Sequence, residues 1–341
     1  MHFLDRISSK RVIIGADLTR AILLGVLVLS TKLTMPLIIT IQAICCIAGI
    51  FFNAAREDCF SEKLNCLGEN SKSYFLAIDN QVMRVMEVAG YGLAFLVIGG
   101  FGYRTSYAVD AASFILSALI LSFIANSLKQ DCGKGILQFK SGISAGIHAV
   151  SNSNVLKSST IVRSITWIGG GIFNIGLLKI ASERTPNIDP ASVSALWQGA
   201  LTLGMILGLE LAKRNSYSIN LFGFCGFGNI IVSVSTMIFA AVTDFRFGLS
   251  VMFVYGIGLG INSFGMRNIR LSNTDKSVFA RVVAFTNMTA KVAEIFGMMF
   301  VITLGNLLTS ATLLAISGAI IGVAGVLALH ESFKSKTTLA Q

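Results

Sequence analysis

Two strings of the sequence each place a cation and a carboxylate three residues apart inside an apolar segment. Arg84 and Glu87 stand in one string, and Lys291 and Glu294 stand in the other. Residues at this spacing share one face of a helix, so each pair can neutralise itself locally. Ionisable groups at membrane depth cost roughly 2.5–3.5 kcal/mol each on insertion scales, so each needs a partner or a watery cavity. We interpret the pairs as candidates for lining a transport cavity; the alternative is that they only hold neighbouring helices together.

A second polar group lies in the apolar segment 158–181. Arg163, Trp167 and Asn174 recur at helical spacing and therefore share one face. A cation, an indole ring and an amide together suit an anionic aromatic ligand such as a catecholate. The alternative is that Arg163 reaches toward the membrane interface while Trp167 packs beside it.

Two carboxylates and one histidine are candidates for carrying a proton. Asp79 and Asp110 are unpaired in the sequence, but each stands near one end of its apolar segment, where water can hydrate it. His148 falls in a short amphipathic stretch, and a solvated surface histidine is the alternative there.

The sequence lacks the usual spacings of nucleotide and metal sites. It contains no P-loop and no His-Glu-x-x-His string, and its six cysteines show no Cys-x-x-Cys spacing. The glycine-rich strings 204–208 and 256–260 lie inside apolar segments, so we interpret them as surfaces where helices cross closely. We therefore expect that the chain is not an enzyme and needs no cofactor or bound metal.

The composition indicates that a lipid bilayer surrounds these residues. Hydrophobic residues make up 54% of the 341 positions and charged residues 13%, with a mean hydropathy of +0.74. A soluble domain of this length would carry more surface charge. The formal net charge of +10 could suggest a nucleic-acid partner, but the cations form short tracts between apolar runs rather than one basic face. We expect a membrane protein with no nucleic-acid partner.

The apolar runs predict about ten membrane-spanning helices, because each is long enough to cross a hydrocarbon core of about 30 Å. Most Lys and Arg residues fall in alternate connections, which predicts that both termini are cytoplasmic. The predicted segments are 12–30, 36–55, 74–99, 105–125, 158–181, 191–211, 218–242, 247–266, 279–304 and 307–329.

The longest connection divides the predicted helices into groups of four and six. Within this connection, residues 139–148 have apolar side chains at near-helical spacing, which predicts an amphipathic helix at the membrane surface. We expect four parts in the chain: an incomplete N-terminal helical bundle at 1–125, a cytoplasmic linker at 126–157, a C-terminal six-helix bundle at 158–330 and a cytoplasmic tail at 331–341.

The two charged strings belong to an internal repeat. Residues 84–90 read Arg-Val-Met-Glu-Val-Ala-Gly, and residues 291–297 read Lys-Val-Ala-Glu-Ile-Phe-Gly. They lie in the third and ninth predicted helices, and two halves of six helices are a known transporter architecture. With this offset, the segments 158–181 and 191–211 have no counterpart in the first half. We therefore expect that the first two of twelve helices are missing.

Several short motifs resemble the major facilitator superfamily, particularly its enterobactin- and macrolide-exporter branch. Residues 4–11 (Leu-Asp-Arg-Ile-Ser-Ser-Lys-Arg) resemble the family's loop after its second helix, with Asp5, Arg6, Lys10 and Arg11 as the motif residues. Residues 16–21 are similar to the start of its third helix, residues 51–56 to the end of its fourth, and residues 154–157 to the segment entering its seventh. One departure is that Glu87 and Val88 stand where antiporters of the family carry a Gly-Pro pair.

This resemblance implies a two-bundle fold and secondary active transport by alternating access. It implies a small-molecule substrate, a proton as the candidate coupling ion, and a location in the bacterial inner membrane. Export of a drug-like or siderophore-like molecule is the first expectation. The alternative is a truncated remnant of such a transporter that does not transport.

Overall fold

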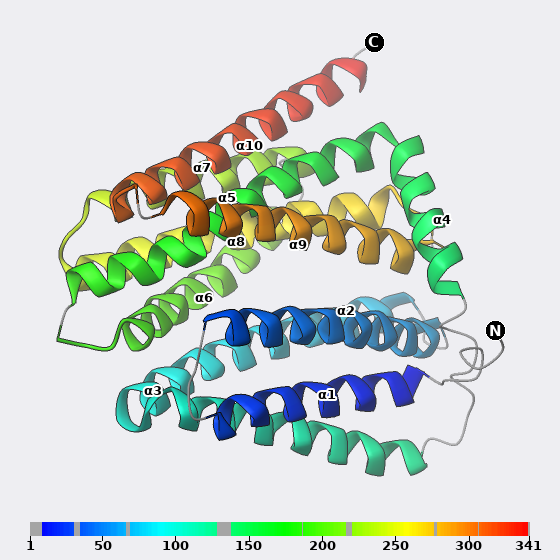
Figure 1. The fold of residues 1–341 in the computed structure, drawn as a ribbon. Coiled ribbons are helices and arrows are strands. Elements are labelled where there is room, and N and C mark those ends of the chain that lie inside the picture. Colours follow the sequence, from blue (N-terminus) through cyan, green and yellow to red (C-terminus); the bar gives the residue numbers. More distant parts are fainter. Residues whose placement is uncertain are drawn as a thin grey trace. The chain divides into compact units, whose positions relative to one another are not determined.

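The computed structural model describes residues 9–30, 35–65, 69–127, 138–185, 187–215, 220–275, 278–305 and 307–339. Of these described residues, 93% are helical and none lies in a strand (Figure 1). The described helices are α1 (Ser9–Leu29), α2 (Met35–Asn65), α3 (Glu69–Ser127), α4 (Gln138–Asn152), α5 (Asn154–Arg184), α6 (Pro190–Arg214), α7 (Leu221–Ala241), α8 (Phe245–Ser272), α9 (Phe279–Leu304) and α10 (Ser310–Leu339).

Every apolar segment expected from the sequence coincides with one of these helices, which confirms the all-helical fold. Within the described residues, eight stretches are long and apolar enough to cross a membrane. This number is below ten for two reasons. The apolar part of α2 shortens to Thr40–Asn53, and Ala89–Phe123 forms one stretch across two expected segments.

The long helix α3 consists of two helices joined at Gly102. The backbone there has φ 80° and ψ 175°, which lies outside the helical region. A positive φ of this kind favours glycine, because a Cβ atom would clash with the neighbouring backbone. The break falls between the expected segments 74–99 and 105–125, so the boundary predicted from the sequence is confirmed.

The described helices group into two compact units. Unit 1 comprises Met1–Ala77 and Gly100–Ala145, and unit 2 comprises Ile78–Gly99 and Gly146–Gln341. Residues 78–99 were expected in the first bundle, but the structure groups them with α5–α10. This segment approaches α6 at two places: a Cβ atom at Gly99 would lie 3.3 Å from the Ser192 hydroxyl, and Gly199 faces Tyr91.

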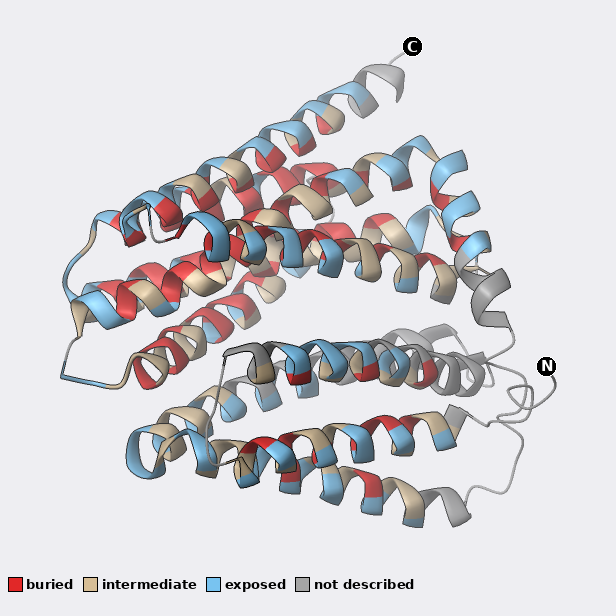
Figure 2. Ribbon diagram, in the orientation of Figure 1, coloured by how far each residue is buried: buried red, intermediate tan, exposed pale blue. Residues whose placement is uncertain are grey.

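Each unit has its own apolar core. In unit 1, Leu24, Leu27, Ile41 and Ala111 pack together from α1, α2 and α3. The core of unit 2 is larger and contains stacked aromatic rings. Phe173 stacks on Tyr255 with ring centroids 4.6 Å apart, and Trp197 meets Phe239 edge-on at 5.0 Å. Buried positions lie on the helix faces that turn toward neighbouring helices within the unit (Figure 2).

Glycines allow α6 and α8 to cross closely. A Cβ atom at Gly204 would overlap the carbonyl oxygen of Phe253, and one at Gly256 would overlap that of Leu201. The backbones therefore touch without side chains between them, as expected for small residues in membrane helices. This confirms the interpretation of the glycine-rich strings as helix-packing surfaces.

Two cations of unit 2 bind carbonyl groups at helix ends. Lys179 donates to the carbonyl oxygens of Gly305 and Leu308, both at 2.7 Å. Arg184 donates to those of Phe239 at 3.0 Å and Ala240 at 2.8 Å. The last carbonyls of a helix have no partner within it, and its C-terminus carries partial negative charge, so these cations stabilise the ends of α7 and α9.

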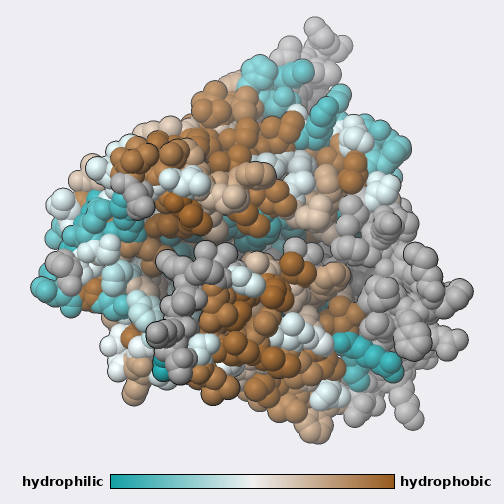
Figure 3. Space-filling model, viewed as in Figure 1, coloured by the Kyte–Doolittle hydropathy of each residue, from teal (hydrophilic) through white to brown (hydrophobic). Residues whose placement is uncertain are grey.

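The outward-facing side chains are largely apolar. On α9, Ile295, Phe296, Met299 and Ile302 are all more than half exposed. Hydrophobic residues cover broad areas over the helices in the space-filling view (Figure 3). Water is a poor solvent for such a surface, whereas lipid chains solvate it.

The predicted amphipathic helix is present as α4, and it packs onto the start of α9. Gly146 lies against the carbonyl group of Arg281, and Val150 packs with Leu156 and Val282. His148 is exposed and lies 2.9 Å from the Asn152 amide nitrogen. The location of α4 at a membrane surface stays a prediction.

Candidate functional site

The two polar groups predicted in separate segments meet at one place in unit 2. Trp167 and Asn174 come from α5, and Lys291 and Glu294 come from α9. We call these four residues the polar seam. The sequence predicts the two groups separately, because the spacing within each segment does not indicate that α5 and α9 are neighbours.

Glu294 is the centre of the polar seam. One carboxylate oxygen accepts a hydrogen bond from the Lys291 ammonium at 2.6 Å, and the other accepts one from the Asn174 amide at 3.1 Å. The Glu294 side chain is 8% exposed, whereas that of Lys291 is 60% exposed. The carboxylate is therefore shielded and held from two sides, while the ammonium remains accessible. The predicted local pairing of Lys291 with Glu294 is confirmed.

The Lys291 ammonium also lies over an aromatic ring. Its nitrogen is 5.1 Å from the centroid of the Trp167 ring, a distance at which the ring quadrupole attracts a cation. An accessible ammonium, an indole face and a buried carboxylate thus lie side by side within two apolar helices. This arrangement can bind a small molecule that carries negative charge and an aromatic group.

Close helix contact explains why these side chains meet. A Cβ atom at Gly171 would overlap the carbonyl oxygen of Glu294, and one at Gly297 would overlap that of Ile168. Gly297 is the last residue of the repeated string, so its place in that string has a packing role. The side-chain contacts Arg163–Asn287, Trp167–Lys291 and Asn174–Glu294 occur in the same order along both helices, so α5 and α9 run in the same direction.

Arg163 lies one turn before Trp167 and meets a residue that sequence analysis missed. Its guanidinium donates to the side-chain oxygen of Asn287 at 2.9 Å. Asn287 lies four residues before Lys291 and seven before Glu294, so all three share a face of α9. That spacing was a readable signal for Asn287, in the same way that spacing singled out Asn174 in α5.

Other predicted site residues lie elsewhere or outside the described part of the chain. Asp5 and Arg6 are outside the described residues, as are the side chains of Arg84, Glu87 and Asp79. Lys10 and Arg11 lie at the start of α1, where Arg11 is exposed. Asp110 belongs to unit 1, is exposed and lies within electrostatic range of Arg20. The roles proposed for these residues stay predictions.

Unit 1 contains a buried charge pair that the sequence analysis did not propose as a site. Asp17 is 1% exposed, and its oxygens face the Arg20 guanidinium at 3.5 Å and accept a hydrogen bond from Ser117 at 2.8 Å. Arg20 also lies over the rings of Phe52 and Phe114, at 5.1 and 5.2 Å. The signal was the same three-residue spacing of opposite charges that singled out the other two pairs.

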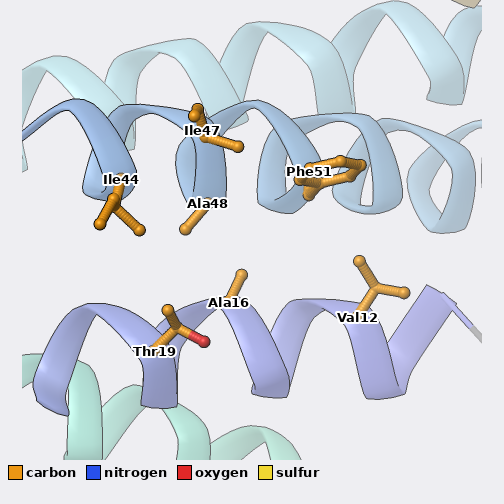
Figure 4. A pocket seen from close by; sticks show the side chains of 7 residues that line it. All are labelled: Val12, Ala16, Thr19, Ile44, Ile47, Ala48 and Phe51. Atoms are coloured by element: carbon orange, nitrogen blue, oxygen red, sulfur yellow. The ribbon is translucent and has the colours of Figure 1, made fainter. Parts of the chain in front are cut away.

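A pocket in unit 1 lies between α1 and α2 (Figure 4). Its volume is about 290 Å³, and its lining is apolar apart from one hydroxyl. That hydroxyl, on Thr19, donates its hydrogen to the carbonyl oxygen of Gly15 at 2.7 Å, so this hydrogen is already used within the helix. The pocket suits an apolar group rather than an ion. The lining residues are Val12, Ala16, Thr19, Ile44, Ile47, Ala48 and Phe51.

The described residues show no metal-binding cluster. None of their His, Cys, Asp and Glu residues form a group of three or more that could hold a metal ion. The expectation that the chain has no Gly-x-Ser-x-Gly string is wrong, because residues 142–146 (Gly-Ile-Ser-Ala-Gly) have this spacing of hydrolase nucleophile elbows. They fall in the helix α4, whereas an elbow requires a strand-to-helix turn. The match therefore has no catalytic context.

Comparisons with known proteins show the fold. No family model matches the sequence, and no curated protein matches it. A structure titled as a bacterial homologue of the iron transporter ferroportin in an inward-facing state superposes with a TM-score of 0.63 at 12% identity. This superposition covers 97% of the present chain and 84% of the other chain.

A second solved structure supports the same conclusion. It is titled as a bacterial metal transporter and superposes with a TM-score of 0.57 at 12% identity, covering 94% of the present chain and 82% of the other. Together with the eight apolar helices, these superpositions identify the chain as an integral membrane protein with the helical fold of these transporters.

Proposed function

We propose that the chain is a secondary transporter that carries a small molecule across the membrane by alternating access. The fold shared with two transporter structures supports this proposal. The observation that carries it is the polar seam, where the buried Glu294 carboxylate holds an accessible Lys291 ammonium beside the Trp167 ring. Charged groups inside membrane helices are costly and usually serve ion or substrate pathways.

The substrate class that best fits the polar seam is an anionic aromatic molecule, such as a catecholate. The accessible Lys291 ammonium can pair with its negative charge, and the Trp167 ring can stack on its aromatic plane. This is the chemistry of a siderophore-like cargo, and export with proton coupling is the direction we propose. We also propose the bacterial inner membrane as its location, with both termini in the cytoplasm.

A divalent metal ion is the second candidate substrate, because both superposed structures are titled as metal transporters or their homologue. Glu294 supplies an oxygen ligand of the kind that metal ions prefer. However, both of its oxygens already accept hydrogen bonds, and a neighbouring ammonium repels a cation. The polar seam as it stands therefore favours an anion over a metal ion.

Transport by the purified chain in lipid vesicles tests the proposal. Vesicles with an imposed pH gradient are supplied either with a labelled catecholate or with Mn²⁺, and accumulation is compared with protein-free vesicles. We expect catecholate movement that depends on the gradient and is lost in Lys291→Gln. Movement of Mn²⁺ alone would replace the substrate assignment with a metal ion. Movement of neither would favour the non-transporting remnant.

A further inference from the structure

Two arginines without an acidic partner lie at one end of unit 2. At this end α5, α7 and α9 begin and α8 ends. Arg163 lies in α5 and Arg270 in the last turn of α8. Among the described residues, no carboxylate forms an ion pair with either arginine, and the Arg270 side chain makes no hydrogen bond. The hydrogen bond of Arg163 goes to the neutral Asn287.

Their guanidinium groups are also partly removed from water, and their chain neighbours Val162 and Ile269 pack in one apolar cluster with Cys225. The Nε atoms of both arginines are buried and have no hydrogen-bond partner. Arg270 lies within electrostatic range of Arg163 and of a third cation, Arg267. The Cys225 thiol, which is fully buried, lies within range of both Arg163 and Arg270 and supplies no full negative charge.

A third unsatisfied group lies four residues after Arg270, just beyond the end of α8. The hydroxyl oxygen of Thr274 is buried and has no hydrogen-bond partner. Buried polar groups in proteins are almost always hydrogen-bonded, and buried charges are almost always paired. Three unsatisfied groups at one end of a bundle, two of them mutually repelling cations, therefore point to a missing anion.

We propose that Arg163 and Arg270 bind a phosphate-type oxyanion at this end of unit 2. Guanidinium groups offer planar pairs of N–H donors that match phosphate oxygens, and an anion between two arginines relieves their repulsion. The unsatisfied Thr274 hydroxyl, four residues after Arg270, is a candidate for a further donor. The phosphate can belong to an anionic lipid headgroup or to a soluble phosphate, since both present the same oxygens. This inference does not rest on the proposed transport function.

Binding to the purified full-length protein in an uncharged detergent tests the proposal. Two probes distinguish the sources: inorganic phosphate, compared with chloride at equal ionic strength, and phosphatidylglycerol, compared with diacylglycerol, which lacks the phosphate. Thermal unfolding followed against probe concentration gives the affinity, and native mass spectrometry counts bound lipid. We expect saturable stabilisation by at least one probe. Stabilisation by the lipid alone identifies a headgroup, and stabilisation by phosphate alone identifies a soluble ligand.

Matched variants locate the binding. Arg270→Gln and Arg163→Gln should each weaken the affinity by about tenfold or more, because each loses charge-assisted hydrogen bonds to the probe. The control is Arg214→Gln at the same end of the bundle, whose side chain is 74% exposed and pairs with Glu210. This control should change the affinity by less than about twofold, as expected for an exposed cation.

Three results would overturn the proposal. These are no saturable stabilisation by either probe, unchanged affinity in Arg270→Gln, and an equal loss in Arg214→Gln, which would indicate general surface attraction. If Arg270→Gln fails to fold, Arg270→Lys replaces it, because lysine keeps the charge but loses the planar donor pair. An affinity for Arg270→Lys equal to that of the wild-type protein would then contradict the proposed geometry.

Discussion

Replacing Glu294 with glutamine should strongly slow transport while leaving the protein folded. Glutamine has nearly the same shape and can still accept the hydrogen bond from Asn174. It cannot hold the Lys291 ammonium by charge, so that side chain, already 60% exposed, is released. The change therefore removes a charge from the polar seam without leaving a cavity.

The expected loss of stability is small. Because Lys291 is largely exposed, solvent screens its pairing with Glu294, and the pair contributes about 0.5–1 kcal/mol. The bond from Asn174 changes from a charged acceptor to a neutral one, which costs about 1 kcal/mol. Together these effects amount to about 1–2 kcal/mol, enough to lower the Tm by a few degrees but not to unfold the protein.

The expected loss of transport is much larger than the loss of stability. If Glu294 positions Lys291 for the substrate, losing one such charged interaction should slow transport by about 10- to 100-fold. The assay is catecholate movement into vesicles containing equal amounts of folded protein. The matched control is Glu210→Gln, whose carboxylate pairs with Lys213 and Arg214 on an exposed helix face. A transport rate for Glu294→Gln equal to that of Glu210→Gln would refute the reasoning.

Three further changes have outcomes that follow from single contacts. Gly297→Ala should destabilise the protein by about 1–3 kcal/mol, because the Cβ atom of the new alanine overlaps a carbonyl oxygen of α5. The control is Gly90→Ala, at the same place in the repeated string. A Cβ atom there meets nothing within 4 Å, so thermal unfolding should show that the change is tolerated. Arg184→Ala removes two hydrogen bonds to carbonyls at the end of α7 and should lower the free energy of unfolding by about 1–2 kcal/mol, whereas an unchanged denaturant midpoint would contradict this. Ser117→Ala leaves one oxygen of the buried Asp17 without its hydrogen bond and should cost about 1–3 kcal/mol, with Ser117→Thr restoring part of the loss.

Much of the helical architecture could be predicted from the sequence. The ten apolar segments matched helices because a chain in lipid must satisfy its backbone hydrogen bonds locally. The break in α3 was also predictable, because residues 100–104 (Gly-Phe-Gly-Tyr-Arg) interrupt the apolar run. Pairs of charges on one helix were also predictable, because the helical period fixes which residues share a face. The contact between Lys291 and Glu294 is of this local kind.

The contacts between helices could not be predicted in this way. The bond from Asn174 to Glu294 joins α5 to α9, and nothing in the spacing within either segment specifies that neighbour. Packing specified it instead, through the close approach at Gly171 and Gly297. The approach of residues 78–99 to α6 is likewise a contact between helices that the spacing within either segment does not specify.

Tryptophan fluorescence tests the central claim, that the polar seam binds the transported solute. The chain has two tryptophans, so Trp197→Phe leaves Trp167 as the single reporter. Trp197 itself is 1% exposed. This variant is titrated with dihydroxybenzoate, with free tryptophan amide as the control for light absorption. We predict a saturable change in Trp167 emission that disappears when Lys291→Gln is added. No saturable change, or one that persists without Lys291, would contradict the account.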